Sequence, residues 1–181
     1  MASAVALLRG INVGGHRRVP MAELRELAHE LGLINPRTYV ASGNLVFETD
    51  IRPEDVASDL EQAIEQRFGF PVDVIARSAA DWRAYVHSNP FPEAARAMPK
   101  WVWMFLSKEL PREQAMEELA DAAPDLRVER AGDAIWIHMP DGVSKAMLRI
   151  KWDRVIGSPS TSRNWRTVET IGRKLEEHQI G

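Results

Sequence analysis

Residues 4–49 read AVALLRGINVGGHRRVPMAELRELAHELGLINPRTYVASGNLVFET, and this stretch decides the fold. The apolar run at residues 4–8 is typical of a buried strand. A glycine-containing loop follows, and Pro20 is expected to open a helix because proline is favoured at the first helical position. Two further strands are expected at residues 37–41 and 45–49, joined by a tight turn. The stretch therefore predicts a strand, a helix and a hairpin.

The residues after this stretch complete a six-element pattern. Pro53 is expected to open a second helix, Gly69 to end it, and residues 72–76 to form another strand. The resulting order, β-α-β-β-α-β, is that of the ferredoxin-like split βαβ arrangement. Ser78 and Asp81 then have the spacing of a capping box, which predicts one further short helix. The fold class indicated by these patterns is α+β.

The second half of the chain nearly repeats this order. The elements expected there are a strand at residues 101–106, a helix near Pro111, a hairpin over 126–139, a helix at 144–156 and a C-terminal helix at 162–178. The second half is therefore predicted to be β-α-β-β-α with a C-terminal helix. We divide the chain into a ferredoxin-like subdomain at residues 1–78, a helical connector at 79–100 and a second α+β subdomain at 101–181.

Composition limits the chemistry that this chain can perform. It has 181 residues, of which 45% are hydrophobic, and it contains no cysteine. Disulfides, thiolate metal ligands and a cysteine nucleophile are therefore excluded. The start lacks the basic residues of a signal peptide, and no apolar run reaches the length of a membrane span. We therefore expect a cytoplasmic protein with no membrane partner.

Charge is distributed unevenly along the sequence. The net charge is −3, which argues against a general nucleic-acid coat. Between residues 144 and 174, however, eight basic residues stand beside two acidic ones. The basic residues are Lys145, Arg149, Lys151, Arg154, Arg163, Arg166, Arg173 and Lys174. Such an excess is typical of a surface that meets an anionic partner, although solvated helix faces give the same pattern.

Three separated segments carry most of the remaining information. They are residues 7–15, LLRGINVGG, residues 42–47, SGNLVF, and residues 161–167, TSRNWRT. In this order and spacing they resemble the uncharacterised family catalogued as domain of unknown function 1697 (DUF1697). The resemblance covers essentially the whole chain and implies an α+β fold related to ferredoxin-like subdomains, but no established reaction. The chain departs from the family pattern where its glycine loop meets His16, Arg17 and Arg18 instead of a lysine.

Topology predicts that the first two segments are neighbours. In a β-α-β-β-α-β unit, the end of the first strand and the turn between the next two strands lie at the same edge of the sheet. Glycines there would let a ligand approach the backbone, and the polar side chains would suit an anion. The candidate ligand-binding residues are Arg9, Gly10, Asn12, Gly14, Gly15, Ser42, Gly43 and Asn44. The alternative is structural: the glycines and Asn12 shape turns, and Arg9 pairs with a carboxylate.

The third segment is expected at the start of the C-terminal helix. Thr161 or Ser162 is the expected N-cap. Arg163 in the first turn would be unfavourable beside the helix dipole unless an anion were close, and a helix start can hold a phosphate. Arg163 and Asn164 are therefore added to the candidate ligand-binding residues. Trp165 belongs to the apolar stripe of the helix and is interpreted as a core residue.

Several familiar site patterns are missing from the sequence. The glycine segment lacks the lysine and hydroxyl of a nucleoside-triphosphate P-loop, and it lacks the spacing of a dinucleotide fingerprint. The five histidines are scattered, and none pairs with another at metal-ligand spacing. We therefore expect neither a metal nor another cofactor.

Three functions are compatible with these patterns. The first is the binding of a phosphate-bearing ligand, a nucleotide or a nucleic acid, at the glycine segment and the hairpin turn, with the basic C-terminal third adding attraction. The second is a small enzyme in the same cleft, with Arg9 stabilising an oxyanion and His16 or Ser42 transferring a proton. The third is a protein-interaction module with an exposed apolar patch. The aromatic residues considered for that patch are Trp101, Trp103 and Trp136, and the sequence names no protein partner.

Overall fold

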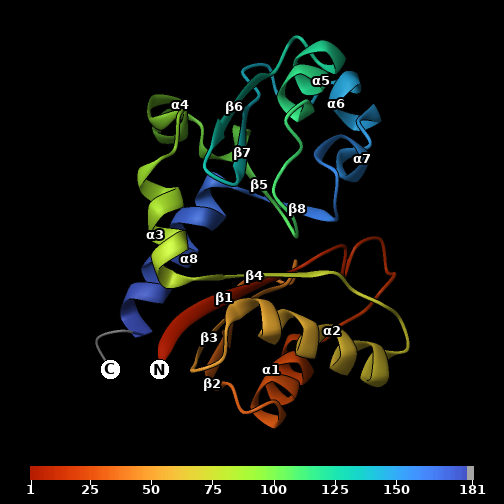
Figure 1. Cartoon of the computed structure of the whole chain (residues 1–181), viewed down its shortest axis with the longest axis vertical. Coiled ribbons are helices and arrows are strands. Elements are labelled where there is room, and N and C mark those ends of the chain that lie inside the picture. The colour runs from red at the N-terminus through yellow and green to blue at the C-terminus, as the bar shows by residue number, and fades with distance from the viewer. Residues whose placement is uncertain (179–181) are drawn as a thin grey trace. The chain divides into compact units, whose positions relative to one another are not determined.

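The computed structural model describes residues 1–178, which divide into two compact units (Figure 1). The first unit comprises Met1–Arg83 and the described residues from Ile171 onward, and the second comprises Ala84–Thr170. These limits differ from the boundaries expected at residues 78 and 100. The reason is that helices α3 (Ala79–His87) and α8 (Trp165–His178) each begin in one unit and end in the other.

The first unit has a four-stranded sheet with two helices on one face (Figure 1). Its elements are β1 (Ala2–Leu8), α1 (Met21–Glu30), β2 (Ile34–Thr38), β3 (Asn44–Thr49), α2 (Pro53–Phe68) and β4 (Val74–Ser78). The strands lie in the order β2-β3-β1-β4, and every neighbouring pair is antiparallel. The β-α-β-β-α-β order predicted for this part of the chain is confirmed.

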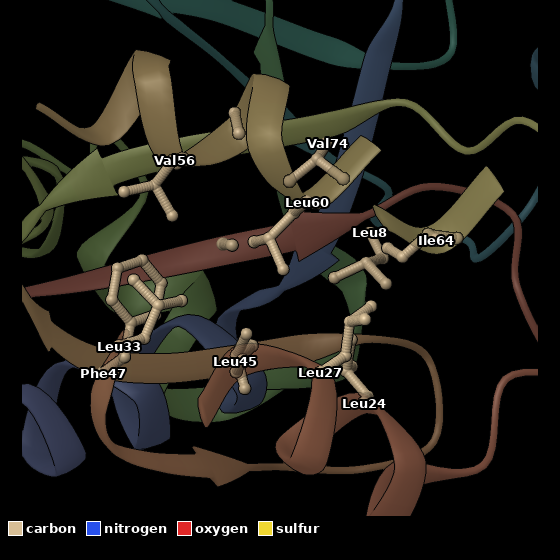
Figure 2. Close-up of a cluster of buried hydrophobic side chains, with 14 of the residues drawn as sticks. Leu8, Leu24, Leu27, Leu33, Leu45, Phe47, Val56, Leu60, Ile64 and Val74 are labelled. Atoms are coloured by element: carbon tan, nitrogen blue, oxygen red, sulfur yellow. The ribbon is translucent and has the colours of Figure 1, made fainter. Parts of the chain in front are cut away.

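The core of the first unit lies between this sheet and its two helices (Figure 2). Leu8, Leu45 and Phe47 from the strands meet Leu24 of α1 and Leu60 of α2, and all five are fully buried. Burying one such side chain stabilises the folded state by about 1.5–3 kcal/mol. This packing holds the strands and helices in place. It therefore also positions the loops at the strand ends, where the candidate site was predicted.

Local signals in the sequence set several ends of these elements. Pro53 stands in the first turn of α2, and Gly69 ends the helix in the left-handed conformation with φ 80°. The predicted capping box is present: the N–H of Asp81 donates to Ser78 Oγ at 3.1 Å, and the N–H of Ser78 donates to Asp81 Oδ2 at 3.2 Å. Both ends of this capping interaction therefore satisfy backbone donors at the start of α3.

Strand β2 begins earlier than the sequence indicated. It starts at Ile34 and its pairing with β3 shifts between Ile34 and Arg37. Within this interval Asn35 has φ 49°, and Pro36 lacks the N–H that a regular ladder would use. The edge strand therefore carries an irregularity that breaks its alternating pattern, which explains why the sequence placed it too late.

The second unit repeats the sheet of the first. Its elements are α4 (Pro92–Ala97), the 3-10 helix η1 (Pro99–Trp101), β5 (Val102–Ser107), α5 (Ala115–Ala122), β6 (Arg127–Ala131), β7 (Ala134–His138), α6 (Lys145–Arg149), α7 (Trp152–Ile156) and β8 (Ser160–Asn164). The strands lie in the order β6-β7-β5-β8, again antiparallel at every pair. Each strand therefore occupies the position of its counterpart in the first unit.

The fourth strand of this sheet was not predicted. Residues 160–164 were expected partly as the start of a helix, but they pair with β5, with Thr161 opposite Leu106 and Arg163 opposite Met104. The edge of β5 offers hydrogen-bond partners along the whole segment, and this tertiary pairing outweighs a weak local helical preference. The prediction of a helix from residue 162 is wrong, since α8 begins at Trp165.

The prediction of a single helix over residues 144–156 is also wrong. This stretch is divided into α6 and α7 by Ile150 and Lys151, whose ψ angles are 127° and 80°. Met147 and Ile156 both lie in the core of the second unit. Nine residues along a continuous helix would place them on opposite sides, about two and a half turns apart. The break lets both side chains reach the same core.

Candidate functional site

The first segment leaves the sheet at the end of β1. The N–H of Arg9 donates to the carbonyl of Asp73 at 3.0 Å, and Arg9 Nη1 lies 3.1 Å from Asp73 Oδ2. The two side chains are 38% and 36% exposed, so the ion pair contributes no more than about 1 kcal/mol. The carboxylate partner considered as the structural alternative for Arg9 is therefore present.

Residues 10–18 then form a small structure, exposed from Val13 onward, that we call the glycine hairpin. The N–H of Asn12 donates to the carbonyl of Arg17, and the N–H of His16 donates to the carbonyl of Val13, each at 3.1 Å. Val13, His16 and Arg17 are exposed. Backbone hydrogen bonds within the segment therefore close a tight hairpin turn.

Two glycines form the tip of the glycine hairpin. Gly14 and Gly15 have φ angles of 58° and 79°, and positive φ at both central residues is what a type I′ turn requires. An added Cβ would meet no atom closer than 4.0 Å at either position, so the requirement is conformational. Among residues 1–178, neither glycine N–H donates to a protein atom. Two backbone donors are therefore available at the tip.

Asn12 joins the glycine hairpin to the turn before β3. Its Nδ2 donates to the carbonyl of Val19 at 2.9 Å and to the carbonyl of Ala41 at 2.8 Å, while its Oδ1 accepts from the N–H of Val19 at 2.9 Å. The bond to Ala41 brings the first two sequence segments together, as topology predicted. It also commits the amide of Asn12 to a structural role.

Gly43 brings the same two segments into close packing. It has φ 91°, and its carbonyl accepts from the N–H of Leu8 at 2.8 Å. A Cβ at this position would lie 2.7 Å from Leu8 Cβ and 2.9 Å from Ile11 Cδ1. Glycine is therefore required both by the backbone conformation and by the two buried side chains beneath the turn.

Ser42 and Asn44 flank this glycine. Asn44 is fully buried, and its Nδ2 donates to the carbonyl of Tyr39 at 2.8 Å and lies 3.4 Å from Ser42 Oγ. The N–H of Tyr39 donates in return to the carbonyl of Asn44 at 2.9 Å. The Asn44 side chain therefore closes the turn from inside the sheet, which satisfies a buried amide.

Left-handed backbone conformations gather at this edge of the sheet. The residues with positive φ in the glycine hairpin and in the turn before β3 are Gly10, Asn12, Gly14, Gly15, Arg17, Val40 and Gly43. Val40 is the most unusual, because a β-branched side chain strongly disfavours its φ of 51° and the residue is 48% exposed. Backbone strain of this kind persists where the surrounding structure enforces it, and it is concentrated at functional sites.

Basic residues follow the tip of the glycine hairpin. His16, Arg17 and Arg18 follow the tip in sequence, and all three are exposed. In the part of the chain that the structure describes, neither arginine forms an ion pair. The sequence showed these residues as a departure from the family pattern and did not include Arg17 and Arg18 among the candidate ligand-binding residues. The signal that could have identified them was their position directly after the two turn-forming glycines.

Arg163 lies on β8 of the second unit and is 7% exposed. Its Nη1 donates to Thr161 Oγ1 at 2.8 Å and to the carbonyl of Ser162 at 2.7 Å. Burial lowers the pKa of Arg163 to about 10, so the guanidinium remains charged at neutral pH. The expectation that Arg163 stands in the first turn of a helix is wrong, because it precedes α8.

Asn164 caps that helix. Its Oδ1 accepts from the N–H of Thr167 at 3.1 Å, which is the bond expected of an N-cap residue. The prediction of Thr161 or Ser162 as the N-cap is therefore wrong, because both residues lie within strand β8. Arg163 and Asn164 belong to the second unit, and the other eight candidate residues belong to the first.

The remaining titratable groups were compared with the ligand sets of metal sites. Among residues 1–178, no group of three or more histidine or acidic side chains could hold a metal ion. Burial, followed by the charge of Arg127, lowers the pKa of His138 from its ordinary value. His138 belongs to β7 of the second unit, whereas the histidine beside the glycine hairpin, His16, is exposed.

The three tryptophans considered for an interaction surface pack within the second unit. Trp136 is fully buried and lies 5.9 Å from the ring of Trp165. Trp101 and Trp103 are partly buried against the core of the second unit. These residues therefore supply packing there and do not form the exposed patch that an interaction module would need. Within the same described residues, every helix is too short or too polar to cross a lipid bilayer.

The geometry defines a protein of two α+β units, each with a four-stranded antiparallel sheet, and with a strained, turn-rich edge on the first. Residues 1–136 match the family described as "Protein of unknown function (DUF1697)", so the chain belongs to this family and the resemblance is confirmed. No curated protein matches the sequence.

The fold is also similar to a solved structure. That structure is of the conserved bacterial protein SP0830 from Streptococcus pneumoniae, with a TM-score of 0.80 and 25% sequence identity. The similarity covers 96% of this chain and 98% of that chain. It supports the predicted α+β fold over nearly the whole sequence.

Proposed function

We propose that this protein binds a phosphate-bearing ligand, a nucleotide or a nucleic acid, through the glycine hairpin. The observation that supports this most is the composition of the tip. Two glycine N–H groups without protein acceptors stand beside Arg17 and Arg18, which have no ion-pair partner among residues 1–178. Backbone donors and arginines at an exposed turn are the groups that phosphate oxygens accept from.

Arginine suits this ligand better than lysine would. Its planar guanidinium offers parallel donors that match two oxygens of one phosphate, and it stays charged at any physiological pH. After its two turn-forming glycines this chain has a histidine and then two arginines. The proposal therefore assigns the principal phosphate contacts to Arg17 and Arg18.

Rigidity of the glycine hairpin favours binding. The three hydrogen bonds of the Asn12 side chain and the paired backbone of residues 12–17 hold the tip before any ligand arrives. A preorganised loop loses less conformational entropy when it binds. In this proposal Asn12, Gly43 and Asn44 act by shaping the edge, and the groups that touch phosphate are the N–H groups of Gly14 and Gly15 with the two arginines.

A thermal-shift panel tests the proposal. The ligands are nucleotides, sugar phosphates, inorganic phosphate and a short RNA, and the proteins are the native chain and an Arg17→Ala/Arg18→Ala variant. A ligand at 100 times its dissociation constant stabilises the folded state by about 2.7 kcal/mol, which is measurable. We expect at least one phosphate-bearing ligand to raise the melting temperature of the native chain and to have little effect on the variant.

A matched control removes two charges elsewhere. Arg52 and Arg96 are 77% and 76% exposed and lie outside both the glycine hairpin and the basic C-terminal third. The Arg52→Ala/Arg96→Ala variant should retain the ligand-induced shift. Equal losses in both double variants would show that only net charge matters, and no shift with any ligand would contradict the proposal.

A further inference from the structure

The second unit contains a hollow of about 540 Å³ beside α5, α6 and α7. Glu118 and Asp121 of α5 line one side, and three basic residues, Arg149, Lys151 and Arg154, line the other. Its volume falls within the range of about 300–1,000 Å³ that small-molecule sites occupy. The basic residues come from the cationic stretch that the sequence showed between residues 144 and 174.

The break between α6 and α7 brings the three basic residues to the same hollow. In a continuous helix, Arg149 and Lys151 would project about 200° apart and could not line one surface. The non-helical backbone at Ile150 and Lys151 ends α6 and separates it from α7. Arg149, Lys151 and Arg154 then line the same hollow, which the helix expected from the sequence would not allow.

The charge of the hollow is positive. The charge of Glu118 is balanced by Arg112, which is not a lining residue and whose Nη2 lies 2.9 and 3.0 Å from the two carboxylate oxygens. Asp121 is then the remaining acidic residue of the lining, against three basic ones. In the described part of the chain, none of those three forms an ion pair. An anion carrying two charges would match this balance.

Arg112 also fixes the two sides of the hollow to each other. Its Nε and Nη2 donate to the carbonyl of Val155 on α7 at 3.0 and 2.9 Å, while the same Nη2 binds Glu118 on α5. The N–H of Arg112 donates to the carbonyl of Ile156 at 2.9 Å. Hydrogen bonds within the chain therefore hold the two sides of the hollow together, and small-molecule sites are usually largely pre-formed.

We propose that this hollow binds a small phosphate monoester whose organic part is apolar or planar. A phosphate monoester carries close to two negative charges at neutral pH, which suits three basic residues opposed by one acidic residue. Ile150 and Val155 are half-buried in the lining and offer an apolar surface for the organic part. This site belongs to the second unit and does not depend on the function proposed for the glycine hairpin.

Titration of the full chain with phenyl phosphate, followed by amide NMR spectra, tests the inference. We expect saturable shifts at residues 118–122 and 149–155. Phenol, which lacks the anion, should produce no comparable shifts, and inorganic phosphate should bind at the same residues more weakly. Absence of shifts at these residues with phenyl phosphate, or equal shifts with phenol, would overturn the proposal.

Variants separate this site from a general effect of charge. Lys151→Ala should weaken phenyl phosphate binding by about fivefold, the size expected for losing one charge-assisted contact. Asp121→Asn should strengthen it by about twofold, because it removes the opposing charge. The Arg52→Ala/Arg96→Ala control and the Arg17→Ala/Arg18→Ala variant should leave the dissociation constant unchanged. A Lys151→Ala protein that binds as the control does, with an intact amide spectrum, would contradict the assignment.

Discussion

Replacing Gly43 with alanine should destabilise the protein by about 3 kcal/mol. The new Cβ would lie 2.7 Å from Leu8 Cβ and 2.9 Å from Ile11 Cδ1. Leu8 Cβ is bonded directly to the backbone of β1, so the clash cannot be relieved by rotating a side chain. Moving the turn outward would instead weaken the 2.8 Å hydrogen bond from the N–H of Leu8 to the carbonyl of Gly43.

Two contributions give this magnitude. Holding a non-glycine residue at a left-handed φ, here 91°, costs about 1–2 kcal/mol. Forcing a methyl group into a packed interior costs typically about 1–3 kcal/mol. Their sum is a large fraction of the roughly 5–15 kcal/mol by which a domain is stable.

Urea unfolding followed by circular dichroism measures the effect, with Gly32→Ala as the matched control. Gly32 has φ 78°, but a Cβ there would meet no atom within 4 Å, so only the conformational cost of about 1 kcal/mol applies. With a slope of about 2 kcal/mol per molar urea, the midpoint should fall by about 1.5 M for Gly43→Ala and about 0.5 M for Gly32→Ala. Equal midpoints for the two variants would refute the packing argument for Gly43.

Three further substitutions test local features of the fold. Asn12→Ala should destabilise the chain by about 2 kcal/mol and speed amide exchange at residue 19, because three hydrogen bonds of its amide are lost; unchanged exchange would contradict that role. Ser78→Ala should cost about 1 kcal/mol in urea unfolding, because it removes half of a capping box. The pKa of His138 is lowered in the folded state, so as pH falls the unfolded state binds a proton before the folded state does. The contribution of neutral His138 to stability is therefore present above the ordinary histidine pKa and is lost as pH falls through the lowered pKa. His138→Gln should reduce the loss of melting temperature between pH 7.5 and 5, and an identical pH dependence would exclude this contribution.

The first unit could be predicted from the sequence because its local signals agree with its tertiary structure. Proline starts and glycine stops bound α2, apolar residues recur on one face of each helix, and Gly43 and Asn44 stand where a turn is needed. The second unit was predicted less well where tertiary pairing decided the outcome. Nothing in the sequence of Ser160–Asn164 distinguishes a strand from a helix start until the open edge of β5 is known. The break between α6 and α7 was hidden for the same reason, since it depends on which side chains reach the core.

The candidate site was predicted by position more accurately than by chemistry. Topology correctly placed the glycine segment next to the turn before β3, and the hydrogen bond from Asn12 to Ala41 joins them. Sequence alone could not show that the amides of Asn12 and Asn44 would be used within the fold. It also could not show that Arg9 has a carboxylate beside it, while Arg17 and Arg18 stand exposed on the hairpin.

The salt dependence of RNA binding tests the role of the glycine hairpin most directly. Fluorescence anisotropy with a labelled single-stranded RNA would be recorded over a series of salt concentrations for the native chain, the Arg17→Ala/Arg18→Ala variant and the Arg52→Ala/Arg96→Ala control. Each phosphate contact contributes about 0.7 to the slope of log affinity against log salt. We predict that losing Arg17 and Arg18 makes this negative slope less steep by about 1.4 and that the control keeps the native slope. An unchanged slope in the hairpin variant, or equal changes in both variants, would contradict the proposal that the glycine hairpin contacts nucleic-acid phosphate.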